Sequence, residues 1–300
     1  MKPGRYSDSI GYQQWVMSLI GEGDNLFAVI DPSRYEDQEE CLKALGLSAE
    51  DFEALPNLYE KYAVSIRDRG PRIFSASMES TQWQGIFAQA YQQQAASFLV
   101  ASSLVAVHAH LKSLVRLQMP DGGNSLFRFQ DVIVLSALAP VLDDRQRWAM
   151  LGPARHWVTV DVCGYPHVIG RPERLIRPEK LELTAYQLKV LDDALAPFTV
   201  IYQANETDGA LLQGLDQCAR VRLVRARMQR ARRHGLRRDE DIALYCVLSL
   251  QLPRGFDRVG PVADAIRDAQ RNGTGFGEEI DRVPVQRWRE WDEQLDISYI

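Results

Sequence analysis

Three pairs of ionisable residues lie close enough together in the sequence to suggest acid–base or metal chemistry. They are His108 with His110, Asp143 with Asp144, and Asp192 with Asp193. The histidines are two positions apart on a predicted helix, so they project from different faces and cannot hold one metal ion together. Adjacent aspartates also diverge, which argues against a general acid–base pair at either site.

The motifs that mark cofactor or nucleophile sites are missing from the sequence. Gly21-Glu22-Gly23 lacks the third glycine of a dinucleotide loop and precedes a predicted strand instead of following one. There is no GxSxG, GxxxxGK[ST] or HExxH sequence. No CxxC spacing, which would indicate zinc, occurs among Cys41, Cys163, Cys218 and Cys246. We therefore predict no catalytic residue, no cofactor and no metal, and we do not expect an enzyme.

Arg128 and Asp131 are the polar residues that most strongly suggest a structural role. Arg128 follows a hairpin turn at residues 121–123 and stands between Phe127 and Phe129, in an alternation typical of a strand with one buried face. One interpretation leaves Arg128 on a solvated strand face. The other pairs it with Asp131, or with another carboxylate near the junction of two lobes, as a clamp that supports the fold.

Basic residues are concentrated in the middle of the chain. Residues 171–238 carry fourteen Lys and Arg against eight Asp and Glu, net +6, which leaves net −11 elsewhere. The arginines between residues 220 and 233 spread around a helix axis at about 100° per residue, without aromatic residues for base stacking, so a nucleic-acid surface is not expected. Two interpretations remain, a solvated helix with salt bridges and a docking surface for an acidic protein.

Four residues are candidate partner contacts. Arg220 and Arg227 project about 20° apart on the same helix, two turns from each other. Trp288 and Trp291 are three positions apart among charged residues on the last predicted helix, where we expect them to be partly exposed.

Apolar periodicity predicts an α+β fold with two lobes. Strands at 26–30, 73–77, 97–102 and 157–162 alternate with helices, which predicts an N-terminal α/β lobe with a mixed sheet. A stretch with several prolines, residues 164–180, suggests a boundary between lobes 1–165 and 166–300. The second lobe is expected to be all-helical, with helices at 181–195, 210–234, 239–252, 262–271 and 285–295.

The composition is that of a soluble globular protein, with 46% hydrophobic and 25% charged residues. The sequence has no apolar run long enough to span a membrane, and no apolar stretch follows the basic residues at the N-terminus. A cytoplasmic protein without a membrane partner is therefore expected.

Several separated segments resemble the type VI secretion effector-chaperone family, also called adaptor proteins. Their order and spacing carry the resemblance over residues 26–161, whereas Gln130 and Val132 stand where the family usually has an aromatic residue and a proline. The segments are FAVIDPSR (27–34), RGPRIFSAS (69–77), SFLVASSLVAVHAHLKSLVRLQMPDGG (97–123), FRFQD (127–131) and LGPARHW (151–157).

The resemblance implies a cytoplasmic protein that binds a cognate toxin effector and loads it onto the secretion spike, with the spike's C-terminal extension as one candidate contact. We expect the lobe of residues 166–300 to bind the effector, because it resembles the family least and carries the arginine-rich helix. Two alternatives stay open, a nucleic-acid-associated regulator that uses this helix, and an enzyme with an unrecognised site.

Overall fold

The chain has the predicted α+β fold in a computed structural model that describes residues 4–77, 80–120, 122–174 and 180–297. It forms two compact units, residues 1–195 and 196–300. Within the described ranges, every helix is too short or too polar to cross a membrane.

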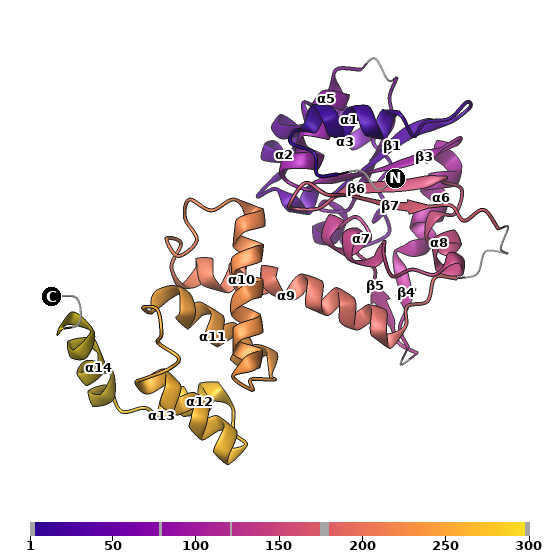
Figure 1. The fold of residues 1–300 in the computed structure, drawn as a ribbon. Helices are drawn as coiled ribbons and strands as arrows, with labels where there is room; N and C mark the ends of the chain where they lie inside the picture. The colour runs from indigo at the N-terminus through magenta and orange to yellow at the C-terminus, as the bar shows by residue number, and fades with distance from the viewer. Residues whose placement is uncertain (1–3, 78–79, 121, 175–179, 298–300) are drawn as a thin grey trace. The chain divides into compact units, whose positions relative to one another are not determined.

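A five-stranded sheet with the order β2-β1-β3-β6-β7 forms the centre of the first unit (Figure 1). All pairings in this sheet are antiparallel, so the expected mixed sheet is not what the chain forms. In an antiparallel pair, the chain leaves one strand and enters the neighbouring strand at the same end of the sheet. Because these connections contain helices, the sequence shows the same alternation of strands and helices as a parallel sheet. The strands are β1 (Asn25–Ile30), β2 (Arg72–Phe74), β3 (Ala96–Ala101), β6 (His156–Val160) and β7 (Pro166–Gly170).

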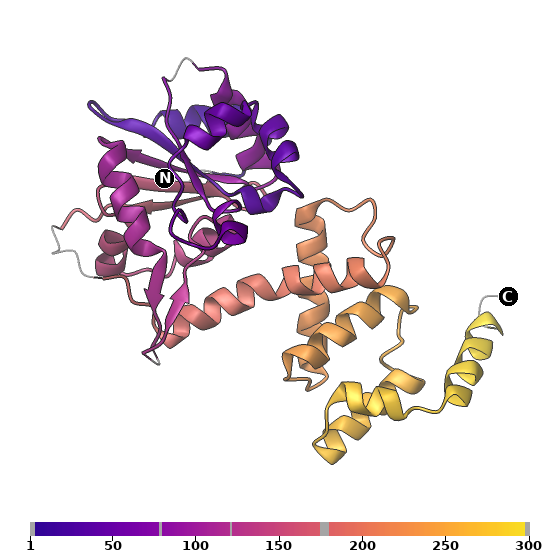
Figure 2. The ribbon, with the colours of Figure 1, turned by 180° about the vertical axis from the view of Figure 1, so that it is seen from behind.

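Helices cover both faces of the sheet, because its central strands are apolar on both sides. Along β1, for example, Phe27 and Val29 belong to one hydrophobic core, and Leu26, Ala28 and Ile30 to the other. Helices α6, α7 and α8 pack on the first face, and α1, α2, α3 and α5 on the second (Figures 1 and 2). The bounds are α1 (Ser9–Met17), α2 (Gln38–Leu45), α3 (Ala49–Ala54), α4 (Val64–Arg67), α5 (Gln82–Gln92), α6 (Leu104–Leu114), α7 (Val132–Leu138) and α8 (Asp144–Leu151).

The predicted hairpin is present but shorter than expected. It pairs β4 (Arg116–Gln118) with β5 (Asn124–Leu126), and Gly122 has φ +83° in the turn, while Asp121 lies outside the described residues. The strand predicted through Arg128 and Gln130 is wrong, because residues 127–130 leave the ladder and turn into α7. Phe127 and Phe129 are both buried, so the aromatic alternation reflects a buried connection and not a strand.

The two units separate later in the chain than the predicted boundary at 165/166. That position falls in the β6–β7 hairpin, where Val160 pairs with Pro166. Proline is tolerated as the first residue of an edge strand, so Pro166 does not mark a linker here. Leu181 and Leu183 also pack into the first core, and the division between the units lies inside α9 (Ala185–Thr207).

The second unit is helical, with no strand among its described residues. Helix α10 packs on α11 and α12 on α13, while α13 also contacts α11 and α14 contacts α12. The bounds are α10 (Gln217–Arg233), α11 (Asp239–Gln251), α12 (Pro261–Asn272), α13 (Phe276–Arg282) and α14 (Val285–Ile297).

Candidate partner-binding surfaces

Arg128 pairs with a buried carboxylate, but with Asp31 and not with Asp131. Asp31 follows β1 directly, its side chain is fully buried, and its Oδ1 accepts hydrogen bonds from the backbone N–H and the hydroxyl of Ser33 at 3.2 and 2.7 Å. The Arg128 Nη2 donates to Ser33 Oγ at 2.9 Å and lies 3.6 Å from Asp31 Oδ2. The Arg128 side chain stays 49% exposed, so both a structural and a partner-binding role are sterically possible.

Asp131 has a different cation, Arg34, which the sequence reasoning missed. Arg34 ends the 3₁₀ turn η1 (Pro32–Arg34), and its Nη2 donates to Asp131 Oδ1 at 2.6 Å. The same oxygen accepts from the Ile133 N–H at 2.9 Å and so caps α7. The two ion pairs therefore tie the end of β1 to the start of α7. Both segments are among those that resemble the effector-chaperone family. Their shared presence in that family was the sequence signal that could have suggested a contact between them.

Arg220 and Arg227 flank the buried stripe of α10 instead of facing solvent. Both side chains are half-buried. The Arg220 Nε donates to the Leu215 carbonyl at 2.8 Å, and the Arg227 Nε is buried without a hydrogen-bond partner in the described structure. Each residue therefore keeps only part of its surface for a partner contact, and their role at an interface stays a prediction.

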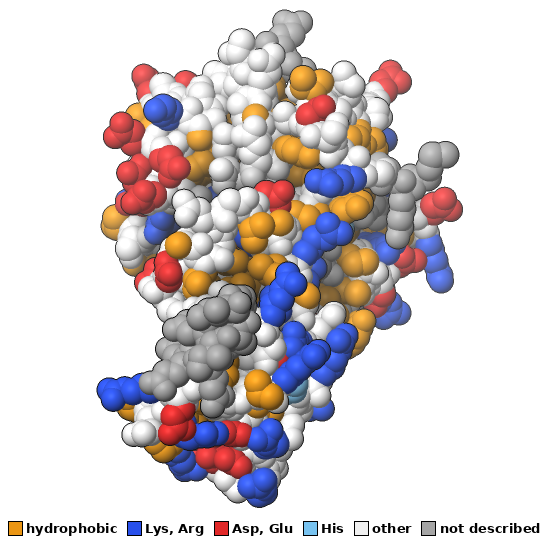
Figure 3. Space-filling view, turned by 60° about the vertical axis from the view of Figure 1, so that its left-hand side comes forward, with side chains coloured by type: hydrophobic (Ala, Val, Ile, Leu, Met, Phe, Trp, Pro, Cys, Tyr) orange, Lys and Arg blue, Asp and Glu red, His pale blue; other side chains and the backbone are white. Residues whose placement is uncertain are grey.

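A second group of α10 arginines faces outward and was not singled out from the sequence. Arg222, Arg225, Arg232 and Arg233 are exposed. At about 100° per residue they fall within an arc of about 100°, and we call them the arginine face. No ion pair to Arg222, Arg225 or Arg233 occurs among the described residues. In Figure 3, Lys and Arg side chains (blue) lie close to one another on part of the face of the molecule that it draws.

A buried carboxylate organises the helices behind the arginine face. Asp257 is fully buried and forms a bidentate pair with Arg230, at 2.6 Å from Nε and 2.5 Å from Nη2. It also accepts from the Tyr245 hydroxyl and lies 2.7 Å from His234 Nε2. These residues come from α10, α11 and the segment after α11, so the network holds the two helices together. Wide sequence separation hid it from sequence reasoning.

Trp291 is a core residue, which corrects the expectation that it is partly exposed. It is 6% exposed, and its indole lies against Gly260, where a Cβ would be 2.5 Å from the ring. Trp288 is half-buried and meets Trp291 edge to face, with centroids 6.1 Å apart. Of the two tryptophans, only Trp288 retains exposed surface for a partner.

Gly260→Ala is expected to destabilise the second unit by about 2 kcal/mol, because the new methyl group would overlap the Trp291 ring and because φ is +83°. Urea unfolding of the full chain with hydrogen exchange read on α12 and α14 measures the loss. Gly209→Ala is the control, since nothing lies within 4 Å of its Cβ position. Equal stability of the two variants would contradict the packing of Trp291.

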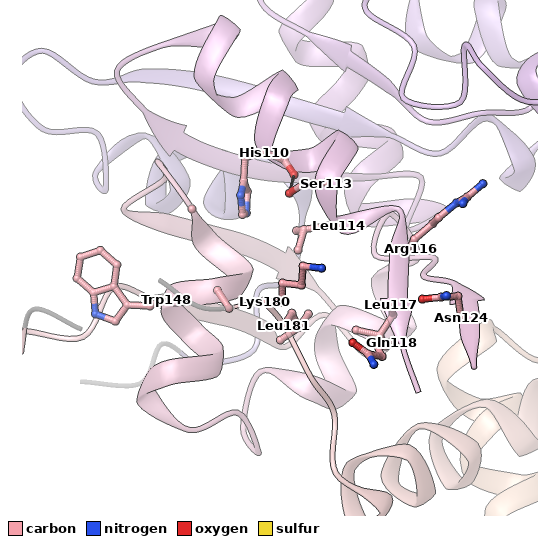
Figure 4. Close-up of a pocket in the computed structure, with 12 residues that line it drawn as sticks. His110, Ser113, Leu114, Arg116, Leu117, Gln118, Asn124, Trp148, Lys180 and Leu181 are labelled. Atoms are coloured by element: carbon pink, nitrogen blue, oxygen red, sulfur yellow. Dashed lines mark hydrogen bonds between the residues drawn. The ribbon is translucent and has the colours of Figure 1, made fainter. Parts of the chain in front are cut away.

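The first unit contains a groove of about 720 Å³ between α6, the β4–β5 hairpin and α8 (Figure 4). Its apolar lining includes Leu114, Leu117, Ala149 and Leu181, and its polar lining includes Arg116 and Lys180. In Figure 4, Lys180 reaches toward the space between α6 and β4, whereas Arg116 extends away along the hairpin.

One wall of this groove depends on a close contact between His110 and Gly152. Gly152 has φ +52°, and a Cβ there would lie 2.3 Å from the His110 ring, so only glycine fits. The His110 Nε2 lies 3.0 Å from the Met150 carbonyl, and burial lowers the pKa of this histidine. His110 therefore serves as a neutral wall residue, and no carboxylate occurs among the described lining residues.

Comparison with known protein families gives a match to part of the chain. Residues 26–149 match the family model described as "Domain of unknown function (DUF4123)". This family is associated with type VI secretion effector adaptors. The matched segment runs from β1 into α8, and so contains both ion pairs that join β1 to α7 and most of the groove lining. No curated protein and no solved structure matched the chain.

Proposed function

We propose that this protein is a type VI secretion effector chaperone, or adaptor, that binds a cognate toxin effector in the cytoplasm and loads it onto the secretion spike. The observation that carries the proposal is the match of residues 26–149 to the DUF4123 family model. The role is non-catalytic in this proposal, and it requires recognition surfaces instead of an active site.

The arginine face indicates that the partner of the second unit is a protein with an acidic surface. Arginine binds carboxylates through forked hydrogen bonds and is enriched at protein interfaces. Arg222, Arg225 and Arg233 are exposed and have no ion pair in the described structure. Carboxylates of a partner can therefore pair with all three without breaking an ion pair within this chain.

Co-expression with the product of the neighbouring gene tests the proposal. We expect the two proteins to co-purify as a stable complex, and we expect the effector to lose solubility when expressed alone. A spike protein added to that complex should form a ternary assembly. Failure of the purified proteins to associate at micromolar concentration would contradict the proposal.

Charge reversal on the arginine face is expected to weaken effector binding about tenfold or more. In Arg222→Glu/Arg225→Glu, two attractive contacts become repulsive ones, while folding stays intact because both side chains are exposed. Titration calorimetry gives the dissociation constant. The control Arg254→Glu/Arg258→Glu makes the same charge change at exposed sites of the same unit and should bind within about threefold of the wild type.

Arg220→Glu/Arg227→Glu serves as a further comparison, because these residues were the candidates from the sequence. Since the Arg227 Nε is buried, we expect this pair to lower the stability of α10 as well as the affinity. The Arg222/Arg225 variant could keep the wild-type dissociation constant while a stably folded Arg220/Arg227 variant loses binding. That result would place the interface on the flank of α10 and not on the arginine face.

The arginine face also favours one alternative, a nucleic-acid-associated regulator. A gel shift at physiological salt distinguishes this alternative, since phosphate binding through arginines depends steeply on salt concentration. We expect no shift of duplex DNA or RNA at micromolar protein. A salt-dependent shift that is abolished by Arg222→Glu/Arg225→Glu would support the regulator instead.

A further inference from the structure

The groove of the first unit has an apolar floor and a rim of exposed polar side chains. Leu114, Leu117 and Leu181 are each at most 6% exposed and line its inner surface. Gln118, Asn124 and Lys180 line the same groove and are exposed. An enclosed small-molecule site would surround its ligand with converging polar groups, whereas here the polar groups are spread along the rim.

The described charged side chains that line the groove are basic, while Asp143 and Glu182 lie with Lys180 in a neighbouring pocket. Neither Arg116 nor Lys180 has an ion pair among the described residues, and the described lining contains no carboxylate. Arg171 adds a third cation beneath the rim, because its guanidinium stacks on the Trp148 ring at 4.4 Å and donates to the Gly152 carbonyl. A ligand with carboxylates would therefore be attracted to this groove.

The β4–β5 hairpin has a free edge at β5 in the described structure, whereas its other edge, β4, makes an isolated bridge from Gln118 to Glu182. Backbone hydrogen bonds join Phe127 to Val115 and Met119 to Gly123 at the two ends of the ladder. By alternation, the N–H and C=O groups of Asn124 and Leu126 point away from β4. Asn124 also lines the groove, so an extended chain that pairs with β5 would pass along its rim.

From these observations we propose that the groove is a second effector-binding site, which takes an extended segment of the effector that carries apolar side chains next to carboxylates. The apolar side chains enter the floor, one carboxylate meets Lys180 inside the groove, another meets Arg116 where that side chain extends away along the hairpin, and the backbone pairs with the edge of β5. This is the β-strand-addition mode of peptide recognition. The inference rests on the proposed function for the identity of the partner, and it adds a contact surface separate from the arginine face.

Two variants of the full-length chain test the groove against the purified effector. Lys180→Glu/Arg116→Glu reverses its charge, and Ser113→Trp places a large ring in it from an exposed position. Each should weaken binding about tenfold or more in titration calorimetry. The control Lys61→Glu/Arg145→Glu makes the same change of charge at exposed residues outside the groove lining and should leave the dissociation constant within about threefold.

A photo-crosslinking amino acid at Gln118, another exposed lining residue, identifies the segment that occupies the groove. Mass spectrometry of the crosslinked complex should locate one effector peptide with Asp or Glu beside apolar residues. A synthetic peptide of that sequence should bind the wild-type chain and lose affinity for the Lys180→Glu/Arg116→Glu variant. Native binding of this peptide by the variant would overturn the charge argument.

The outcomes separate this inference from the proposed function. If the wild-type chain binds the effector and both groove variants bind it equally well, the groove inference fails and the proposed function stands. If the groove variants keep the effector but lose the spike protein, the groove belongs to a different partner and the inference is again wrong. If the wild-type chain does not bind the effector at all, the proposed function and the groove inference fail together.

Discussion

Asp257→Asn is expected to destabilise the second unit by about 3 kcal/mol. The carboxylate is fully buried and accepts hydrogen bonds from Arg230 and Tyr245, with His234 in contact, and these partners come from different helices. Breaking a buried ion pair typically costs 3–5 kcal/mol, and the half-exposed Arg230 can regain part of its hydration, which places the expected loss at the lower end.

Hydrogen exchange in urea, read on peptides of α10 and α11, measures this loss within the intact chain. Asp268→Asn is the matched control, because Asp268 pairs with Arg271 on the surface of α12, where Asp268 is partly exposed and Arg271 largely exposed. Surface pairs of this kind contribute less than about 1 kcal/mol. A similar loss in both variants would mean that the Asp257 network does not hold α10 to α11.

The effect of Asp257→Asn should also depend on pH. Burial raises the pKa of Asp257, but hydrogen bonds from Tyr245, Arg230 and His234 outweigh burial and hold the pKa below its usual range. The stability contributed by this carboxylate is therefore full above the unfolded-state pKa of about 4 and is lost as the pH falls through the lowered folded-state pKa. The stability difference between wild type and variant should shrink below about pH 4. A difference that stays constant down to pH 2 would contradict the ion-pair account.

Arg34→Ala is expected to destabilise the first unit by about 3 kcal/mol, and Arg128→Ala by about 1 to 2 kcal/mol. Arg34 is mostly buried and lies 2.6 Å from Asp131, whose carboxylate also caps α7. Arg128 is half-exposed and 3.6 Å from Asp31, and Ser33 still donates two hydrogen bonds to Asp31 when Arg128 is removed. Because Arg128 is half-exposed, solvent also screens its charge and lowers its expected contribution to stability.

Urea melts of both variants, with hydrogen exchange read on α7, compare the two arginines directly. Exposed Arg145→Ala is the control for loss of an arginine from the same unit, and it should change stability by no more than about 0.5 kcal/mol. A larger loss for Arg128→Ala than for Arg34→Ala would reverse the assignment. An Arg128→Ala variant of native stability that no longer binds the effector would place Arg128 in a partner site.

Local patterns in the sequence were sufficient to locate most elements of this protein. Asp37, Ser48 and Asp131 are residue types that favour the N-terminal cap of a helix, and each accepts a hydrogen bond from the backbone of the first turn. The apolar residues Leu104, Val107, Leu111 and Leu114 have the spacing of one helix face, and α6 spans them. These features depend on residues within a few positions of one another, which sequence patterns record directly.

Contacts between distant residues had to come from the tertiary structure. The direction of each strand depends on the end of the sheet at which a long connection re-enters it. The boundary between the units depends on the pairing of β7 with β6. The partner of Asp131 stands 97 positions away in the chain, so its neighbour Arg128 was the nearer guess. Burial separates Arg220 and Arg227 from the outward arginines of the same helix, although all of them have the same residue type. A sequence records which groups can pair, whereas the packed chain decides which of them meet and which face water.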